Sequence, residues 1–96
     1  MTKWFLAPAA ADDLDRLLDF MMTASPDHAI ETMDLITDGL SLLARHPVIG
    51  RPIGHGLREL VIAHGKSGYV ALYSYDESAD VALVLAVRHQ RERDYH

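Results

Sequence analysis

The spacing of apolar residues changes near residue 47, and this change limits the folds that the chain can adopt. Before this point, apolar side chains recur every three or four residues, the period of a helix that buries one face. The spacing predicts helices over residues 9–22 and 26–45, separated by a short interval and therefore forming an antiparallel hairpin. Pro26 suits the first position of the second helix, and Ser25 suits the capping position before it. The expected apolar face of this helix comprises Ile30, Met33, Ile36 or Thr37, Leu40 and Leu43.

Beyond residue 47 the apolar residues form short continuous runs between segments rich in glycine or acidic residues. The runs predict an antiparallel meander of strands over residues 57–62, 69–75 and 81–87. The segments between them predict a loop over residues 48–56 and turns over residues 65–68 and 76–80. A short run at residues 4–6, before Pro8, predicts an edge strand that pairs with a later one.

This order of elements indicates an α+β fold, in which an N-terminal strand and an antiparallel helical hairpin pack on a small antiparallel sheet. The length of 96 residues suits a single domain that spans residues 1–96. Asp12 and Asp13 are expected in the first turn of the first helix, where carboxylates favour the positive end of the helix dipole.

Composition excludes several kinds of site. The chain has no cysteine, which rules out disulfides and thiolate ligands. Its six histidines, at positions 28, 46, 55, 64, 89 and 96, show no spacing typical of metal ligands, so we expect neither a metal site nor a cofactor. There is no signal-peptide pattern and no apolar run near the roughly 20 residues that span a bilayer. We therefore expect a cytoplasmic protein with no membrane contact.

Charge is unevenly distributed along the chain. The formal net charge is −5, of which residues 1–44 carry −6, with two basic residues against eight acids. Residues 45–96 carry +1, with seven basic residues against six acids. Proteins that bind nucleic acids usually present a basic surface. We therefore expect no direct sequence-specific binding of nucleic acid, and any phosphate contact would depend on a local patch.

The two longest predicted strands are apolar on both faces. In one, Tyr69, Ala71 and Tyr73 alternate with Val70 and Leu72. In the other, strict alternation would place Val81, Leu83 and Leu85 on one face and Ala82, Val84 and Ala86 on the opposite face. Two helices can cover only one face of such a sheet, so the other face calls for loops, self-association or a second chain.

Several short motifs follow one another in an order found in a family of bacterial toxins. They are Ala10-Ala11-Asp12-Asp13-Leu14, Arg45-His46-Pro47, Gly50-Arg51-Pro52, Gly56-Leu57-Arg58-Glu59-Leu60, the run from Gly68 to Tyr73, and the run from Val84 to Glu92 followed by Tyr95. Together they resemble the RelE/ParE superfamily over essentially the whole chain. The resemblance implies a helical hairpin on a small antiparallel sheet. It also implies a cognate, ParD-like antitoxin that wraps and silences the toxin in a hetero-oligomeric complex.

The superfamily contains two activities. RelE-type members cleave messenger RNA on the ribosome, which requires an acid, a base and cations near the scissile phosphate. Arg58, Arg88, His89 and Tyr95 are the candidates for such a site. However, Val70 follows Tyr69 where nucleases of this type often carry an arginine.

ParE-type members instead inhibit DNA gyrase, a type II topoisomerase, by protein–protein contact. The run Arg88-His89-Gln90-Arg91 looks more like this type, which we therefore expect. The candidate residues for binding the target or the antitoxin are Arg58, Arg88, His89, Arg91, Arg93 and Tyr95. Two simpler interpretations stay open: Arg58 could pair with a nearby acid such as Glu59, and the charged tail could be solvated. A toxin-like module that binds an antitoxin but has no activity is a further alternative.

Overall fold

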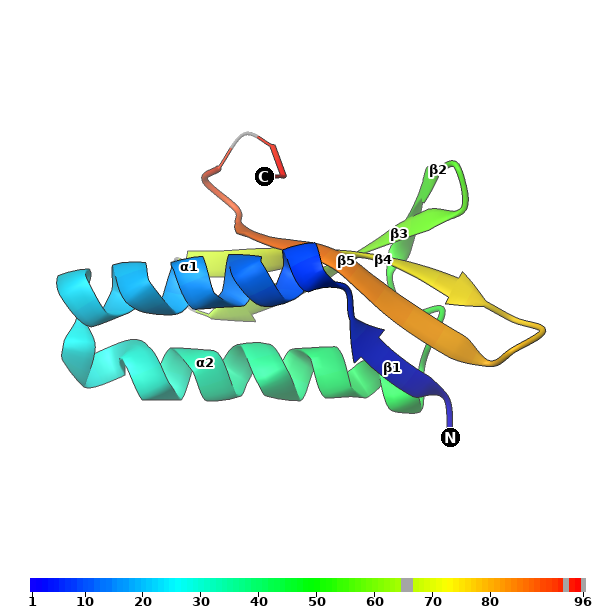
Figure 1. The fold of residues 1–96 in the computed structure, drawn as a ribbon, viewed down its shortest axis with the longest axis horizontal. Helices are drawn as coiled ribbons and strands as arrows, with labels where there is room; N and C mark the ends of the chain where they lie inside the picture. Colours follow the sequence, from blue (N-terminus) through cyan, green and yellow to red (C-terminus); the bar gives the residue numbers. More distant parts are fainter. Residues whose placement is uncertain (65–66, 93, 96) are drawn as a thin grey trace.

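The computed structural model describes residues 1–64, 67–92 and 94–95, and it has the predicted α+β architecture (Figure 1). The N-terminal half contains strand β1 (Lys3–Leu6), helix α1 (Pro8–Ala24), helix α2 (Pro26–Ser41) and a short 3-10 helix, η1 (Leu42–Ala44). The C-terminal half contains strands β2 (Arg51–Gly54), β3 (Leu57–His64), β4 (Ser67–Asp76) and β5 (Val81–His89). The change of apolar period near residue 47 therefore marks the change from helices to strands.

The strands form one sheet in the order β1-β5-β4-β3-β2. The strands β3, β4 and β5 pair antiparallel, as predicted for the meander. In addition, β2 pairs antiparallel with β3, and β1 pairs parallel with β5. The expectation that residues 4–6 pair with a later strand is confirmed, but the sheet is mixed rather than wholly antiparallel. The helical hairpin separates β1 from the meander, so no tight turn forces β1 to run antiparallel.

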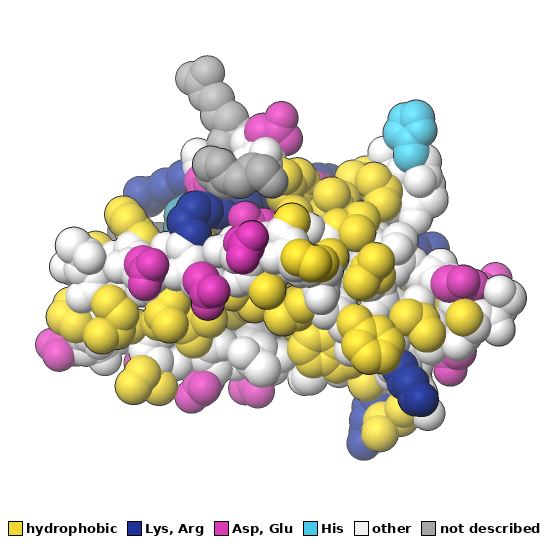
Figure 2. All heavy atoms as spheres, in the orientation of Figure 1, with side chains coloured by type: hydrophobic (Ala, Val, Ile, Leu, Met, Phe, Trp, Pro, Cys, Tyr) yellow, Lys and Arg dark blue, Asp and Glu magenta, His cyan; other side chains and the backbone are white. Residues whose placement is uncertain are grey.

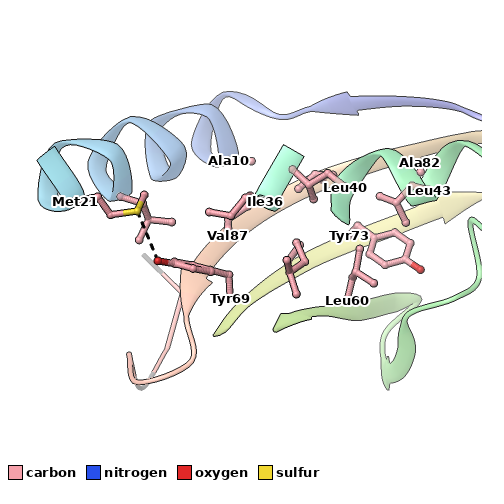
Figure 3. Close-up of a cluster of buried hydrophobic side chains, with 14 of the residues drawn as sticks. Ala10, Met21, Ile36, Leu40, Leu43, Leu60, Tyr69, Tyr73, Ala82 and Val87 are labelled. Atoms are coloured by element: carbon pink, nitrogen blue, oxygen red, sulfur yellow. Dashed lines mark hydrogen bonds between the residues drawn. The ribbon is translucent and has the colours of Figure 1, made fainter. Parts of the chain in front are cut away.

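The two helices lie side by side on one face of the sheet, as Figure 1 shows. Their apolar faces meet β5 and β3, and the core between the layers contains the largest fully buried side chains: Ile36, Leu40, Leu43, Tyr73, Val84 and Val87. Figure 3 shows this core beneath the helices. The opposite face of the sheet, which the helices do not cover, is called the open face below.

Several local predictions were wrong. The expected loop over residues 48–56 contains β2, whose four residues are all exposed and therefore give no apolar signal. β1 ends before Pro8, as predicted, but α1 begins at Pro8 rather than at residue 9, because proline is well tolerated in the first turn of a helix, where its missing N–H would have no partner. Ser25 precedes α2 but makes no side-chain capping bond, although Pro26 does begin that helix. Of the turn expected over residues 65–68, residues 65–66 lie outside the described part of the chain, and Ser67 and Gly68 belong to β4.

An irregularity in β5 overturns the expected alternation of that strand. Leu72 pairs with Ala86, but its neighbour Tyr73 pairs with Val84, so Leu85 is an extra residue in the ladder. Such a β-bulge reverses the side-chain alternation of the strand beyond it. As a result Val84 and Val87 both enter the core, and Ala86 does not share a face with Val84.

The fully buried Tyr73 joins the sheet to the segment that leads from the helices to β2. Its hydroxyl donates a hydrogen bond to the Pro47 carbonyl and accepts one from the Gly50 amide, each at 2.8 Å. A Cβ atom at position 50 would lie 2.6 Å from the Tyr73 ring, so only glycine fits there. Arg58 Nη1 completes the anchorage by donating to the carbonyls of Gly50 at 2.7 Å and Val48 at 3.1 Å.

In the described part of the chain, neither long helix combines the length and the apolar character that crossing a lipid bilayer would require.

We predict that Tyr73→Phe lowers the free energy of unfolding by about 1–3 kcal/mol, because it leaves the buried Gly50 amide without an acceptor. Urea unfolding followed by circular dichroism measures the change. Tyr75→Phe is the matched control, since the Tyr75 hydroxyl binds Asp80 in an exposed setting and its loss should lower the free energy of unfolding less than loss of the Tyr73 hydroxyl does. Equal effects of the two substitutions would show that the anchorage at Gly50 contributes little.

Candidate functional site

The sheet divides the candidate residues between its two faces. Side chains of directly paired residues on neighbouring strands lie on the same face. Arg58 pairs with Tyr73 and therefore shares the helix-covered face with the core. Arg88 pairs with Val70, and Glu59 pairs with Leu72, so these side chains belong to the open face. Arg58 is thus separated from Arg88 by the sheet itself.

Four side chains on the open face form a compact polar group, named here the open-face cluster: Arg51, Glu59, Arg88 and Tyr95. Glu59, on β3, is buried, with 8% of its surface exposed. Its Oε2 accepts a hydrogen bond from the Tyr95 hydroxyl at 2.7 Å, and its Oε1 accepts two from Arg51, at 2.8 Å from Nη2 and 3.3 Å from Nε. The Arg88 guanidinium lies over the Tyr95 ring, 5.0 Å from the ring centroid.

Glu59 controls the electrostatics of this cluster. The hydrogen bond from Tyr95 and those from Arg51 stabilise the carboxylate and hold the pKa of Glu59 below its usual value of 4.5, against the opposing effect of burial. Burial and the neighbouring Glu59 carboxylate raise the pKa of Tyr95 far above its usual value of 10.0. Tyr95 therefore keeps its proton and donates it in a hydrogen bond, which is unfavourable for a general base.

Arg88 also holds the turn that follows β5. Its Nη1 donates to the carbonyl oxygens of Glu92 at 2.8 Å, His89 at 3.3 Å and Gln90 at 3.4 Å. Together with the Tyr95–Glu59 bond, these contacts fold the described part of the C-terminal segment back onto the open face. This segment is therefore attached to the sheet rather than fully solvated, and Arg88 has a structural role besides any role in binding.

A second surface lies on the helix side of the sheet. A groove of about 780 Å³ separates the end of α1 and the start of α2 from the ends of β4 and β5. Side chains from all these elements line it, among them Phe20, His28, Tyr69, His89 and Arg91. Tyr69 is buried and meets the His89 ring edge-on at 5.2 Å between centroids. Phe20 stands at the groove with 70% of its surface exposed. This surface is named the helix-side groove.

A buried acid connects the helix-side groove to β5. Asp13, in α1, accepts a hydrogen bond from the Val87 amide at 2.9 Å, beside the bulge. Its other oxygen lies 3.6 Å from Arg16, which also pairs with Glu92 at 3.2 Å. Glu92 in turn accepts a bond from the His89 amide at 3.0 Å. This chain of polar contacts fixes the end of β5 and the following turn against α1.

Three of these residues were missed from the sequence. Asp13 was placed in the first turn of its helix, but it lies deeper and is buried, and its spacing from Ala10 and Leu17 already puts it on the buried face. Glu59 was considered only as a partner of Arg58, although a lone acid in an apolar strand signals a specific partner. Arg51 belongs to one of the motifs of the resemblance but was not predicted as a site residue, because β2, which places it opposite Glu59, was not predicted.

The predicted site residues therefore fall into separate places. Arg88 and Tyr95 meet in the open-face cluster, whereas His89 and Arg91 line the helix-side groove. Arg58 donates to the backbone carbonyls of Val48 and Gly50, and among the described residues it makes none of the ion pairs that were left open as an alternative for it. Arg93 lies outside the described residues. Within the described part of the chain, no three His, Asp or Glu side chains gather closely enough to hold a metal ion.

Apolar side chains are exposed along the helical hairpin. Figure 2 shows them in the seam between α1 and α2, with acidic side chains on both helices beside them. Ile30, expected on the buried face of α2, is 73% exposed. It lies near the start of α2, whereas the contacts of α2 with the core are made by Ile36 and Leu40 further along the helix. The hairpin end therefore presents both Phe20 and Ile30 to solvent.

Comparisons with known proteins agree with one another about this architecture. A family model described as the ParE toxin of the type II toxin–antitoxin system parDE matches residues 5–94. The protein named Toxin RelE3 of Caulobacter vibrioides is 33% identical over 88 residues, which cover 92% of this chain and 94% of that protein.

Two solved structures have a similar fold. A chain of the chromosomal ParDE toxin–antitoxin system from P. aeruginosa superposes with a TM-score of 0.75 at 21% identity, covering 91% of this chain and 94% of its own. A chain of the RelBE2 toxin–antitoxin complex from Mycobacterium tuberculosis gives a TM-score of 0.57 at 22% identity, covering 93% and 98%.

We predict that Glu59→Gln removes part of the pH dependence of stability. Because the folded pKa of Glu59 is lowered, its contribution is fully present above about pH 4.5 and is lost as the pH falls through the folded pKa. The difference in unfolding free energy between wild type and Glu59→Gln should therefore be largest near neutral pH and shrink on acidification. Urea unfolding at a series of pH values measures it.

Asp76 and Asp80, whose pKa values hydrogen bonds also lower, are present in both chains and cancel in this difference. Glu77→Gln, in the exposed turn after β4, controls for the change in net charge. A difference that stays constant from neutral to acidic pH would contradict the assignment.

Proposed function

Because the chain belongs to the ParE toxin family of type II toxin–antitoxin systems, within the RelE/ParE superfamily, we propose that it inhibits DNA gyrase or a related type II topoisomerase. The inhibition acts through protein–protein contact and breaks no bond in the target. A ParD-like antitoxin neutralises it by covering the surfaces described above. Two sets of observations support this proposal, one against nuclease chemistry and one for a covering partner.

The observation that carries the proposal is the separation of Arg58 from Arg88 and Tyr95 by the sheet. Cleavage of RNA needs an acid, a base and cations at one phosphate. Arg58 is committed to backbone carbonyls on the helix side, so it cannot join the other two at a phosphate on the open face. Glu59 offsets part of the positive charge of Arg88, and Val70, which pairs with Arg88, adds no cation.

The main alternative is a ribosome-dependent RelE-type endoribonuclease. The contact between Arg88 and Tyr95 favours this alternative, because the nuclease hypothesis places an arginine and a tyrosine at the scissile phosphate. The relative from Caulobacter vibrioides also carries the name RelE3. Against this alternative stand the high pKa of Tyr95, its bond to Glu59 and the net charge of −6 over residues 1–44, which opposes docking on ribosomal RNA.

The helix-side groove is the proposed antitoxin site. It places the exposed Phe20 beside Arg16, His89 and Arg91, so it offers apolar area together with basic groups. An amphipathic segment with acidic residues would satisfy both. The structures that share this fold come from toxin–antitoxin complexes, which supports such a partner.

We predict that Arg91→Ala weakens association with the topoisomerase target by about 1–3 kcal/mol, the range for a charge-assisted hydrogen bond, without changing stability. Arg91 is exposed, whereas Arg88 also holds the C-terminal turn and would confound the measurement. Inhibition of gyrase on supercoiled DNA gives the affinity, and Arg45→Ala, an equal change of charge just before the segment that leads to β2, is the control.

The same preparations should be tested with programmed ribosomes. Codon-specific cleavage there, with unaffected gyrase, would overturn the proposal and establish the nuclease alternative. Inactivity in both assays, with antitoxin binding retained, would favour the inactive antitoxin-binding module.

We predict that Phe20→Ser weakens antitoxin binding by about 1–3 kcal/mol, the value of burying a large apolar side chain. Isothermal titration with the protein encoded beside this one measures the change. Phe5→Ser is the matched control, because Phe5 is 52% exposed on β1, away from the groove. A loss confined to Phe5→Ser would move the antitoxin from the groove to the β1 edge.

A further inference from the structure

The open-face cluster has the composition of an oxyanion site. One guanidinium group, of Arg51, and the phenolic hydroxyl of Tyr95 bond a single carboxylate, and a second guanidinium group, of Arg88, lies over the Tyr95 ring. All three are hydrogen-bond donors of the kind that proteins use for phosphate and carboxylate groups. The carboxylate belongs to Glu59, a residue of the sheet itself. The cluster therefore contains an anion that the chain supplies, with one negative charge against two positive charges.

We propose that Arg51, Arg88 and Tyr95 form a phosphate-binding site that Glu59 occupies from within the chain, so that phosphate groups from solution or from nucleic acid are excluded. Glu59 is then the residue that decides what the open face can bind. This inference concerns the chemistry of the site and holds for either target of the toxin.

The contacts of Glu59 reproduce those that a phosphate would make. Arg51 approaches Oε1 with both Nε and Nη2, as an arginine fork approaches an oxyanion, and Tyr95 donates to Oε2. Arg88 adds positive charge, which also helps to keep the pKa of Glu59 low. Arg51 remains 73% exposed in its side chain, so the cluster is open to solvent on that side.

One donor in the cluster is not used by the carboxylate. Among the described residues, Arg88 Nε is buried and has no hydrogen-bond partner. A buried donor without a partner is costly and rare in folded proteins. A carboxylate offers two oxygens, and both are already engaged by Arg51 and Tyr95, whereas a phosphate offers more. The unused donor therefore indicates that the set of donors exceeds what Glu59 requires.

Glu59 excludes other anions because it is fixed in place. It lies near the start of β3, between Arg51 of β2 and Leu72 of β4, so folding positions its carboxylate without any cost of association. A phosphate from solution must displace it and overcome the repulsion of its charge. Removing the carboxylate favours an anion from solution, because the guanidinium groups of Arg51 and Arg88 then lose the counter-charge of Glu59, which is unfavourable in a partly buried site.

The test uses the full chain with Glu59→Ala, which removes both the charge and the volume, and Glu59→Gln, which removes the charge alone. Glu77→Ala has the same net charge as Glu59→Ala and lies in the exposed turn after β4, so it is the matched control. Each protein is titrated with inorganic phosphate at constant ionic strength. Binding is followed by the thermal midpoint and by the phosphorus-31 linewidth of the ligand.

We expect Glu59→Ala to bind phosphate at least about tenfold more tightly than wild type and Glu77→Ala, the factor that one charge-assisted hydrogen bond supplies. Adding Arg51→Ala to Glu59→Ala should abolish this gain. Should Glu59→Ala fail to fold, Glu59→Gln decides, since it preserves the side-chain volume. The proposal is overturned if the folded variants bind phosphate no better than the control, or if the gain persists without Arg51.

Discussion

The hydrogen bond from the Val87 amide to the buried Asp13 carboxylate attaches β5 to α1 next to the bulge, and the arrangement of both surfaces depends on this part of β5. The bulge at Leu85 reverses the alternation of β5, and the ladder beside it is irregular. Val87 lies beyond the end of β1, which pairs with β5 only as far as Val84, and Asp13 supplies an acceptor for its amide. Without the bulge, the side chains beyond it would exchange faces: Arg88 would turn toward the helices and His89 toward the open face. One extra residue thus determines which side chains each face presents, and the buried acid attaches this part of β5 to α1.

Different interactions stabilise the two faces of the sheet: apolar packing on the helix side and polar contacts on the open face. The helix side is an apolar core in which Tyr73 is fully buried, and the helix-side groove lies at the end of the hairpin. Arg58 is confined there as an anchor for the segment before β2. The helices do not cover the open face, where Glu59 accepts hydrogen bonds from Arg51 and Tyr95 and leaves only Arg88 Nε without a partner among the buried, described atoms of the open-face cluster. A surface of this kind suits recognition by another protein, because few of its charges are left to attract a polyanion.

The sequence was informative where periodicity alone determines structure. The hairpin and the three strands of the meander follow from spacing, because each buries a continuous apolar stripe. It was uninformative where structure depends on pairing partners: β2 has no buried residue, and the bulge exists only in the register between β4 and β5. The position of Arg58 could have been inferred, since it alternates in phase with Leu60 and Ile62, which belong to the core. Glu59, in the opposite phase, then falls on the open face with Val61.

The C-terminal turn belongs to both surfaces, and this determines how substitutions in it must be interpreted. Glu92 pairs with Arg16 beside the helix-side groove, while its carbonyl accepts a bond from Arg88 of the open-face cluster. Loss of the Arg88 side chain therefore releases the turn and disturbs both surfaces, so a defect in such a variant cannot be assigned to either. Arg91 projects from the same turn into solvent at the groove. Arg88 donates to three backbone carbonyls of the turn, whereas the Arg91 side chain donates to none among the described residues. A substitution of Arg91 therefore reports on contacts with a partner rather than on the position of the turn.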